Sequence, residues 1–170
     1  MDELDEIWQQ TMQKAVLQAE ISGRNDIAEY LALKMSNDAI RAECSKWLFS
    51  SFIEIFQNHH QNGLIELETN NPHEFEMKKA TIVGSRLRFR HGLRCLDVEA
   101  GWTRTPKDGF MRGNALAFAK ISHFGMVKNN HELHLKKSET VPQWFAVDVF
   151  GNEQLVKLEY LQTHFHIFVS

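Results

Sequence analysis

The segment TIVGSRLRFRHGLRCLDVEAGW, residues 81–102, alternates apolar and polar side chains on both sides of His91-Gly92. Alternation with a period of two is typical of a β-strand with one buried face, and a glycine between two such runs indicates a hairpin turn. If His91-Gly92 is a two-residue turn, Arg90 pairs with Leu93, and every second pair shares a face. One face then collects the apolar side chains of Val83, Leu87, Phe89, Leu96, Val98 and Ala100. A slip of one residue would mix the two faces, so the pattern favours this pairing.

Further strands are expected on both sides of this hairpin. ALAFAKISHF, residues 115–124, is expected to pair with ELHLKK, residues 132–137, through the connection GMVKNNH. WFAVDVFGNEQLVKLEY, residues 144–160, is expected to turn at Gly151-Asn152, although Leu155, Leu158 and Leu161 also fit a helix from residue 152 to 162. With LIELE at residues 64–68 and FHIFV at residues 165–169, about eight strands in meander order are predicted.

The first 60 residues show helical rather than strand periodicity. Asp2 is expected to cap a helix whose apolar stripe runs from Leu4 to Ala19 at steps of three and four, and Gly23 ends it. Further apolar faces follow over residues 27–35 and 40–55, and Ser36-Asn37 either separates two helices or lies inside a single bent one. Two to three N-terminal helices are therefore predicted.

Helices followed by antiparallel strands are the arrangement of the α+β class. We expect residues 1–62 to form a helical layer that packs on a sheet built from residues 63–170, with the two segments making one compact structure. The sheet is expected to be mostly antiparallel and strongly curved or barrel-like.

Charge is unevenly distributed along the chain. Residues 1–62 carry five basic and ten acidic side chains, whereas residues 78–112 carry nine basic and three acidic ones. Such asymmetry indicates either an anionic partner or attraction between the two halves of one protein.

Several classes of function find no support in the sequence. Cys44 and Cys95 lie far apart in apolar-patterned segments and are expected to be free thiols. The acidic N-terminal residues do not resemble a signal peptide, and no apolar run approaches the roughly 18 residues of a membrane span, so a cytoplasmic protein without membrane contact is predicted. No nucleophile elbow, phosphate-binding loop or dinucleotide fingerprint occurs, and no cofactor is predicted.

Nine histidines raise the question of a metal site. His164 and His166 lie two apart on a predicted strand, which would place both on one face. Phe165, Ile167 and Val169 form the expected core face of that strand, so the two histidines are expected to face outward and no metal site is predicted.

Arg86, Arg88 and Arg90 form a row on the polar face of the predicted hairpin. Such a row could follow the phosphates of a nucleic acid. Asp97 and Glu99 lie on the same face, with Asp97 expected opposite Arg86, and pairing between these charges is the favoured interpretation.

The segment EAGWTRTPKDGFMRGN, residues 99–114, combines turn-forming residues with hydrogen-bond donors. Its TPKDG portion predicts a tight turn that brings Trp102, Arg104, Lys107 and Arg112 together at one rim of the sheet. The favoured function is therefore a non-enzymatic binding or interaction module, whose basic rim holds an anionic small molecule or a protein partner.

A second hypothesis concerns His123, which lies on an alanine-rich strand face that leaves room for a ligand. It describes a ligand carrier or small enzyme with a pocket between helices and sheet, in which His123 is the titratable group. Self-association through the apolar helix 47–56 is a third possibility.

Overall fold

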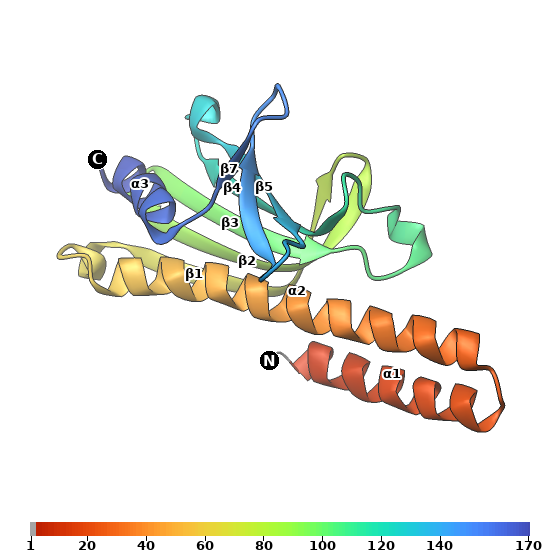
Figure 1. Cartoon of the computed structure of the whole chain (residues 1–170). Coiled ribbons are helices and arrows are strands. Elements are labelled where there is room, and N and C mark those ends of the chain that lie inside the picture. The colour runs from red at the N-terminus through yellow and green to blue at the C-terminus, as the bar shows by residue number, and fades with distance from the viewer. Residues whose placement is uncertain (1–2) are drawn as a thin grey trace. The chain divides into compact units, whose positions relative to one another are not determined.

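A computed structural model describes residues 3–170, and for Leu4 it describes the backbone alone. The structure has two N-terminal helices, an antiparallel sheet and a helix that follows the sheet (Figure 1). The chain divides into two compact units, one that ends at Glu43 and one formed by Cys44–Ser170, and the boundary falls inside the second helix. The expected organisation, with a helical layer of residues 1–62 packed on a sheet of residues 63–170, stays a prediction. Asp2, the expected helix cap, lies outside the described residues.

The first unit contains α1 (Glu3–Ile21) and the beginning of α2 (Asn25–Gln57). Two helices form rather than three, because Ser36-Asn37 lies within α2. Buried Asp38 joins the helices: its carboxylate accepts hydrogen bonds from Trp8 Nε1 at 2.8 Å and from Arg41 Nη1 at 2.6 Å. Among the helices of residues 3–170, none is long and apolar enough to cross a membrane.

In the described chain the sheet has seven strands whose spatial order follows their sequence order, and every pair is antiparallel. They are β1 (Glu66–Met77), β2 (Ala80–His91), β3 (Arg94–Trp102), β4 (Ala115–His123), β5 (His131–Lys136), β6 (Gln143–Val147) and β7 (Glu153–Leu155). The α+β class and the antiparallel sheet are confirmed. The barrel is not, since β1 and β7 are the two edges of an open sheet.

The central hairpin has the predicted faces but a different register. Phe89 pairs with Leu96, and Arg90 pairs with Cys95 rather than with Leu93. The turn consists of Gly92 and Leu93, so glycine takes the first turn position, where its φ of 60° is positive. Type I′ and II′ turns both need a positive φ at that position, and glycine adopts it without strain. The shift moves each partner by two residues and therefore leaves the faces unchanged.

The last predicted strand is wrong, because residues 158–169 form the helix α3 (Leu158–Val169). The buried side chains of α3 recur at helical spacing, at Leu161, His164, Phe165 and Phe168. The segment 152–162 contains both expected structures, since β7 ends at Leu155 and α3 begins three residues later. The β6–β7 connection is also longer than the predicted two-residue turn, because the last pair is Val147 with Glu153 and residues 148–152 lie between them.

The main core lies on one face of the sheet. Phe89 of β2 contacts the rings of Phe52 and Phe56 from α2 and those of Phe165 and Phe168 from α3. The C-terminal part of α2 and the helix α3 therefore cover the same face of the sheet. The sheet buries this face under the two helices instead of closing into a barrel. A smaller apolar cluster is formed by Met77, Ala80, Ile82, Ala115 and Phe118.

Strands β2 and β3 leave no room for a side chain at a pair of glycines. Gly84 lies opposite Gly101 in the register. A β-carbon added to Gly84 would stand 1.9 Å from the carbonyl oxygen of Ala100, and one added to Gly101 would stand 2.5 Å from that of Val83. The backbone path of this hairpin therefore requires glycine at both positions.

Candidate functional site

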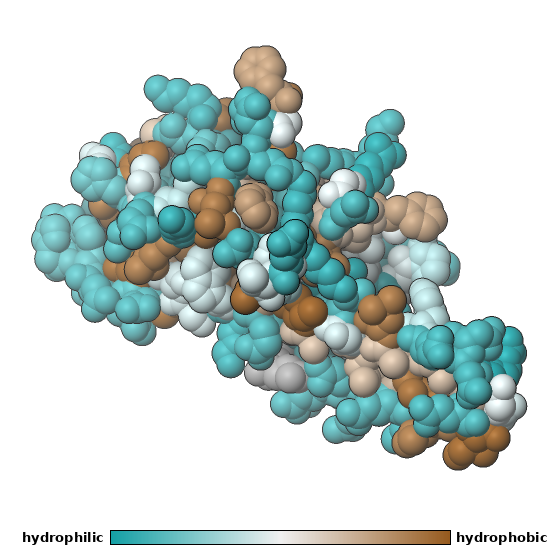
Figure 2. All heavy atoms as spheres, in the orientation of Figure 1, coloured by the Kyte–Doolittle hydropathy of each residue, from teal (hydrophilic) through white to brown (hydrophobic). Residues whose placement is uncertain are grey.

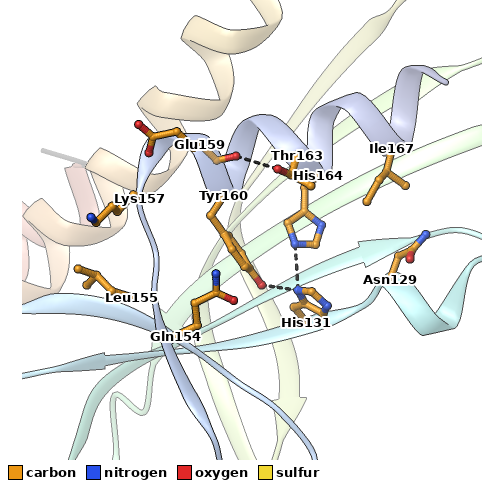
Figure 3. A pocket seen from close by; sticks show the side chains of 10 residues that line it. All are labelled: Asn129, His131, Gln154, Leu155, Lys157, Glu159, Tyr160, Thr163, His164 and Ile167. Atoms are coloured by element: carbon orange, nitrogen blue, oxygen red, sulfur yellow. Dashed lines mark hydrogen bonds between the residues drawn. The ribbon is translucent and has the colours of Figure 1, made fainter.

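Three histidines and a tyrosine form a continuous hydrogen-bonded row, which we call the histidine chain. His123 Nε2 lies 2.9 Å from His164 Nδ1, and His164 Nε2 lies 3.0 Å from His131 Nδ1. The same Nδ1 of His131 also contacts the hydroxyl oxygen of Tyr160. Figure 3 shows the outer part of the chain, with His164 reaching down from α3 to His131 and Tyr160 beside it.

Two local features bring these side chains together. His123 ends β4 and His131 begins β5, and because His131 pairs with Ile121, both face the same side of the sheet as Ile121. Tyr160 and His164 lie four residues apart on α3, so they project from one face of the helix. The row therefore depends on α3 lying over the β4–β5 hairpin.

Burial keeps the histidine chain uncharged at neutral pH. His123 and His164 are each only 2% exposed. Burial, together with the neighbouring His131 and His123, lowers the pKa of His164 to about 3. Burial also lowers the pKa of His123 and raises that of Tyr160 to about 12, and the partial burial of His131, which is otherwise exposed, lowers the pKa of its ring. All four groups are thus neutral at pH 7.

The inner end of the chain stops at a nitrogen without a partner. Within the described residues, His123 Nδ1 is buried and makes no hydrogen bond. At the other end, His131 is exposed at the protein surface. The histidine chain thus runs from the interior of the second unit to its surface.

The outer end of the histidine chain forms part of the wall of a hollow of about 420 Å³, which we call the α3 pocket. Its lining is Asn129, His131, Gln154, Leu155, Lys157, Glu159, Tyr160, Thr163, His164 and Ile167 (Figure 3). These residues come from α3, from β7 and the segment that joins them, from the 3-10 helix Val127–Asn129 and from the start of β5. His123 does not line this hollow but lies behind His164, at the inner end of the chain.

Of the predicted rim residues, Trp102 ends β3, and Arg104, Lys107 and Arg112 lie in the connection between β3 and β4. Trp102 is buried, and the Arg104 guanidinium carbon lies 3.7 Å from the centre of its indole ring. Lys107 and Arg112 are exposed. The TPKDG turn is a short 3-10 helix, Pro106–Asp108, which the Asp108 carboxylate holds by accepting hydrogen bonds from the backbone N–H groups of Arg104 and Thr105.

Two members of the arginine row, Arg86 and Arg88, are paired with nearby polar groups. Arg88 makes two hydrogen bonds of 2.7 Å to the Asp97 carboxylate, and Arg86 donates to Asn70 Oδ1 at 2.8 Å. Asp97 therefore pairs with Arg88 and not with Arg86, in keeping with the two-residue shift in register. This charge pairing agrees with the interpretation favoured above.

The histidines that the sequence placed on a strand have different environments on α3. His166 is exposed as expected, but His164 is buried, and its outward orientation was predicted wrongly because residues 158–169 are helical. Each ring nitrogen of His164 faces a different neighbour, so the three imidazoles form a row and do not converge on one point. Within residues 3–170, no group of three histidine, cysteine or acidic side chains has an arrangement that could hold a metal ion.

Sequence reasoning identified His123 but missed His131, Tyr160 and His164 as members of one site. The available signal was the spacing of Leu158, Leu161, Phe165 and Phe168, which predicts a helix with His164 on its buried side.

No protein-family model matches the chain, and comparison with curated proteins and with solved structures gives no match either.

Proposed function

We propose that this chain binds a small molecule in the α3 pocket and that Tyr160 and His131 are the groups that hydrogen bond it. The observation that carries this proposal is the histidine chain, which connects a buried imidazole to the wall of the pocket. It corresponds to the ligand carrier or enzyme expected from His123, with His123 behind the binding groups rather than among them.

The cost of burying imidazoles supports a functional role for the chain. A buried polar ring loses its hydration, and hydrogen bonds to neighbouring rings return only part of that free energy. Leu161 and Phe165, on either side of His164 in the buried row of α3, show that apolar side chains fill this layer. A phenylalanine at position 164 would avoid the desolvation cost, so the imidazole is better explained by what it holds in place.

The lining of the α3 pocket favours an uncharged ligand with a polar group. Asn129 and Gln154 contribute amides, Leu155 and Ile167 contribute apolar surface, and the charges of Lys157 and Glu159 are opposite in sign. The neutral pair of Tyr160 and His131 can orient a carbonyl, hydroxyl or amide, and it can also exchange a proton with such a group.

Fragment binding followed by NMR tests the proposal. Fragments that carry an amide, a ketone or an alcohol are expected to give saturable shifts of the His131 and Tyr160 ring signals. Tyr160→Phe is expected to weaken the amide and alcohol fragments by about 5- to 10-fold, because their hydrogen bond of roughly 1 kcal/mol to the phenol oxygen is lost. Tyr30 is the one other tyrosine of the chain and is 66% exposed on α2, so Tyr30→Phe is the matched control. Fragments that bind but shift neither His131 nor Tyr160 would refute the α3 pocket.

The basic rim remains a second candidate function, and one observation favours it. Phe110 is 82% exposed and lies in the sequence between the exposed side chains of Lys107 and Arg112. On the face seen in Figure 2, hydrophobic side chains lie among a larger number of hydrophilic ones. An aromatic ring flanked by cations suits a partner that offers both an anionic group and an apolar surface.

Heparin retention, with heparin as the polyanion probe, tests this rim. The double variant Lys107→Glu, Arg112→Glu is expected to elute at a lower salt concentration than the unmodified chain, with the Tm almost unchanged because both side chains are exposed. Lys14→Glu, Lys46→Glu is the control, since it alters the net charge equally at two exposed helix positions. Equal elution of the two double variants would show that heparin responds to net charge rather than to the rim.

A further inference from the structure

The geometry of the histidine chain restricts where its hydrogens can lie. A neutral imidazole carries one N–H, and each nitrogen–nitrogen contact requires one hydrogen between its two atoms. If His164 is protonated on Nε2, then His123 must also be protonated on Nε2 to donate to His164 Nδ1, and His131 must be bare on Nδ1. If His164 is protonated on Nδ1, all three rings carry hydrogen on Nδ1. The rings therefore change tautomer together, between an all-Nε2–H and an all-Nδ1–H arrangement.

The two ends of the chain favour the same arrangement. In the all-Nδ1–H state, the buried Nδ1 of His123 would carry a hydrogen with no acceptor, and a buried unpaired N–H is costly and rare. In the all-Nε2–H state the same atom is a bare nitrogen, and the single lone pair of His131 Nδ1 is shared between two donors, His164 Nε2–H and the Tyr160 hydroxyl. The phenol is then the donor in its contact with His131. This direction is favoured because a phenol O–H is more acidic than the N–H of a neutral imidazole.

We infer that His123 and His164 are positioning residues that fix His131 as its Nε2–H tautomer. His131 then offers a hydrogen-bond donor through its remaining ring nitrogen, and Tyr160, whose hydrogen points to His131, offers its oxygen as an acceptor. This inference rests on the proposed function, because it assigns the ligand class of the α3 pocket. That class is an uncharged molecule with a carbonyl oxygen for His131, such as an amide or a ketone.

The tautomers are measured directly by long-range ¹H–¹⁵N correlation spectra of the full chain at pH 7, without any ligand. Each of His123, His131 and His164 is expected to show a protonated Nε2 and an unprotonated Nδ1. A protonated Nδ1 on His131 in the unmodified chain would overturn the inference. Because no ligand is present, this result is independent of whether the α3 pocket binds fragments.

A substitution at the buried end tests whether the tautomer is transmitted. His123→Glu places a carboxylate acceptor next to His164 Nδ1, which should move hydrogen to Nδ1 on both His164 and His131. In a folded His123→Glu chain, an unchanged His131 tautomer would contradict the positioning role. If this variant does not fold, the tautomers of the unmodified chain decide the question alone.

Two probes of similar size test the ligand class. Benzamide, which presents a carbonyl acceptor, is expected to shift the His131 ring signals at least about 5-fold more strongly at equal concentration than benzylamine, whose ammonium group only donates. Equal shifts from both probes would contradict the assigned class while leaving binding in the pocket intact. Shifts from neither probe, with Nε2 protonated on His131, would count against the proposed function and not against the tautomer.

Discussion

The Gly84→Ala chain is expected to lose the sheet of the second unit. A β-carbon at this position would lie 1.9 Å from the carbonyl oxygen of Ala100 and 2.6 Å from the α-carbon of Gly101. Both contacts are with backbone atoms of the paired strand, so no side-chain movement can relieve them, and β2 would have to separate from β3. The free energy of unfolding should fall by more than about 3 kcal/mol, beyond the usual cost of overpacking a core.

Urea unfolding followed by near-UV circular dichroism measures this loss. Gly63→Ala is the matched control, since a β-carbon there has no neighbour within 4 Å, and it is expected to leave the unfolding midpoint nearly unchanged. If Gly84→Ala unfolded at the same urea concentration as Gly63→Ala, the close approach of β2 and β3 at the paired glycines would be wrong.

Acid is expected to destabilise the chain well above the pH at which carboxylates titrate. Burial, with the neighbouring His131 and His123, holds the pKa of His164 at about 3, and burial, with nearby Lys78 and Lys136, holds that of His134 at about 4. Both values lie below the 6.5 of an unfolded histidine. Between pH 6.5 and 4.5 the unfolded chain therefore binds more protons than the folded chain, and stability falls as the pH falls.

The size of this effect follows from the number of protons. Each histidine contributes up to about 1.4 kcal/mol per pH unit, so His164 and His134 together should remove roughly 3–5 kcal/mol over this window. His134→Phe is expected to remove about half of this contribution to the pH dependence of the free energy of unfolding. The difference in stability between the two chains at pH 7 measures the effect of the substitution on packing alone. Urea unfolding at several pH values measures the slope. A free energy of unfolding that stayed constant from pH 6.5 to 4.5 would show that neither histidine is held neutral by the fold.

The sequence was sufficient for the faces of the central hairpin but not for its register. The face to which a side chain points depends only on whether its position along the strand is odd or even. The alternation around Phe89 and Leu96 is unambiguous in this respect. The register depends on which turn position Gly92 takes, and that choice preserves the faces while moving Asp97 from Arg86 to Arg88. Local turn geometry sets the register of the hairpin, and the hydrophobic pattern is the same for both registers.

The candidate site was predicted in part, for a different reason. His123 was identified because it follows small residues on a strand that the sequence defines well. His164 was missed because a five-residue segment such as FHIFV fits a strand and one turn of a helix equally, and the choice was settled by the packing of Phe165 and Phe168 on Phe89. Tyr160 and His131 are 29 residues apart, so their contact exists only after α3 lies over the β4–β5 hairpin.

The open sheet has a further consequence for how this chain behaves at high concentration. An unpaired edge strand is a template on which a second copy could add its own strand and extend the sheet between molecules. At β1 the register shifts between Asn70 and His73, Pro72 has no N–H to donate, and Glu66, Glu68, Glu74 and Glu76 are all exposed. A copy paired at this edge would meet an interrupted ladder and like charges, so β1 protects the chain from aggregation through its longest free edge.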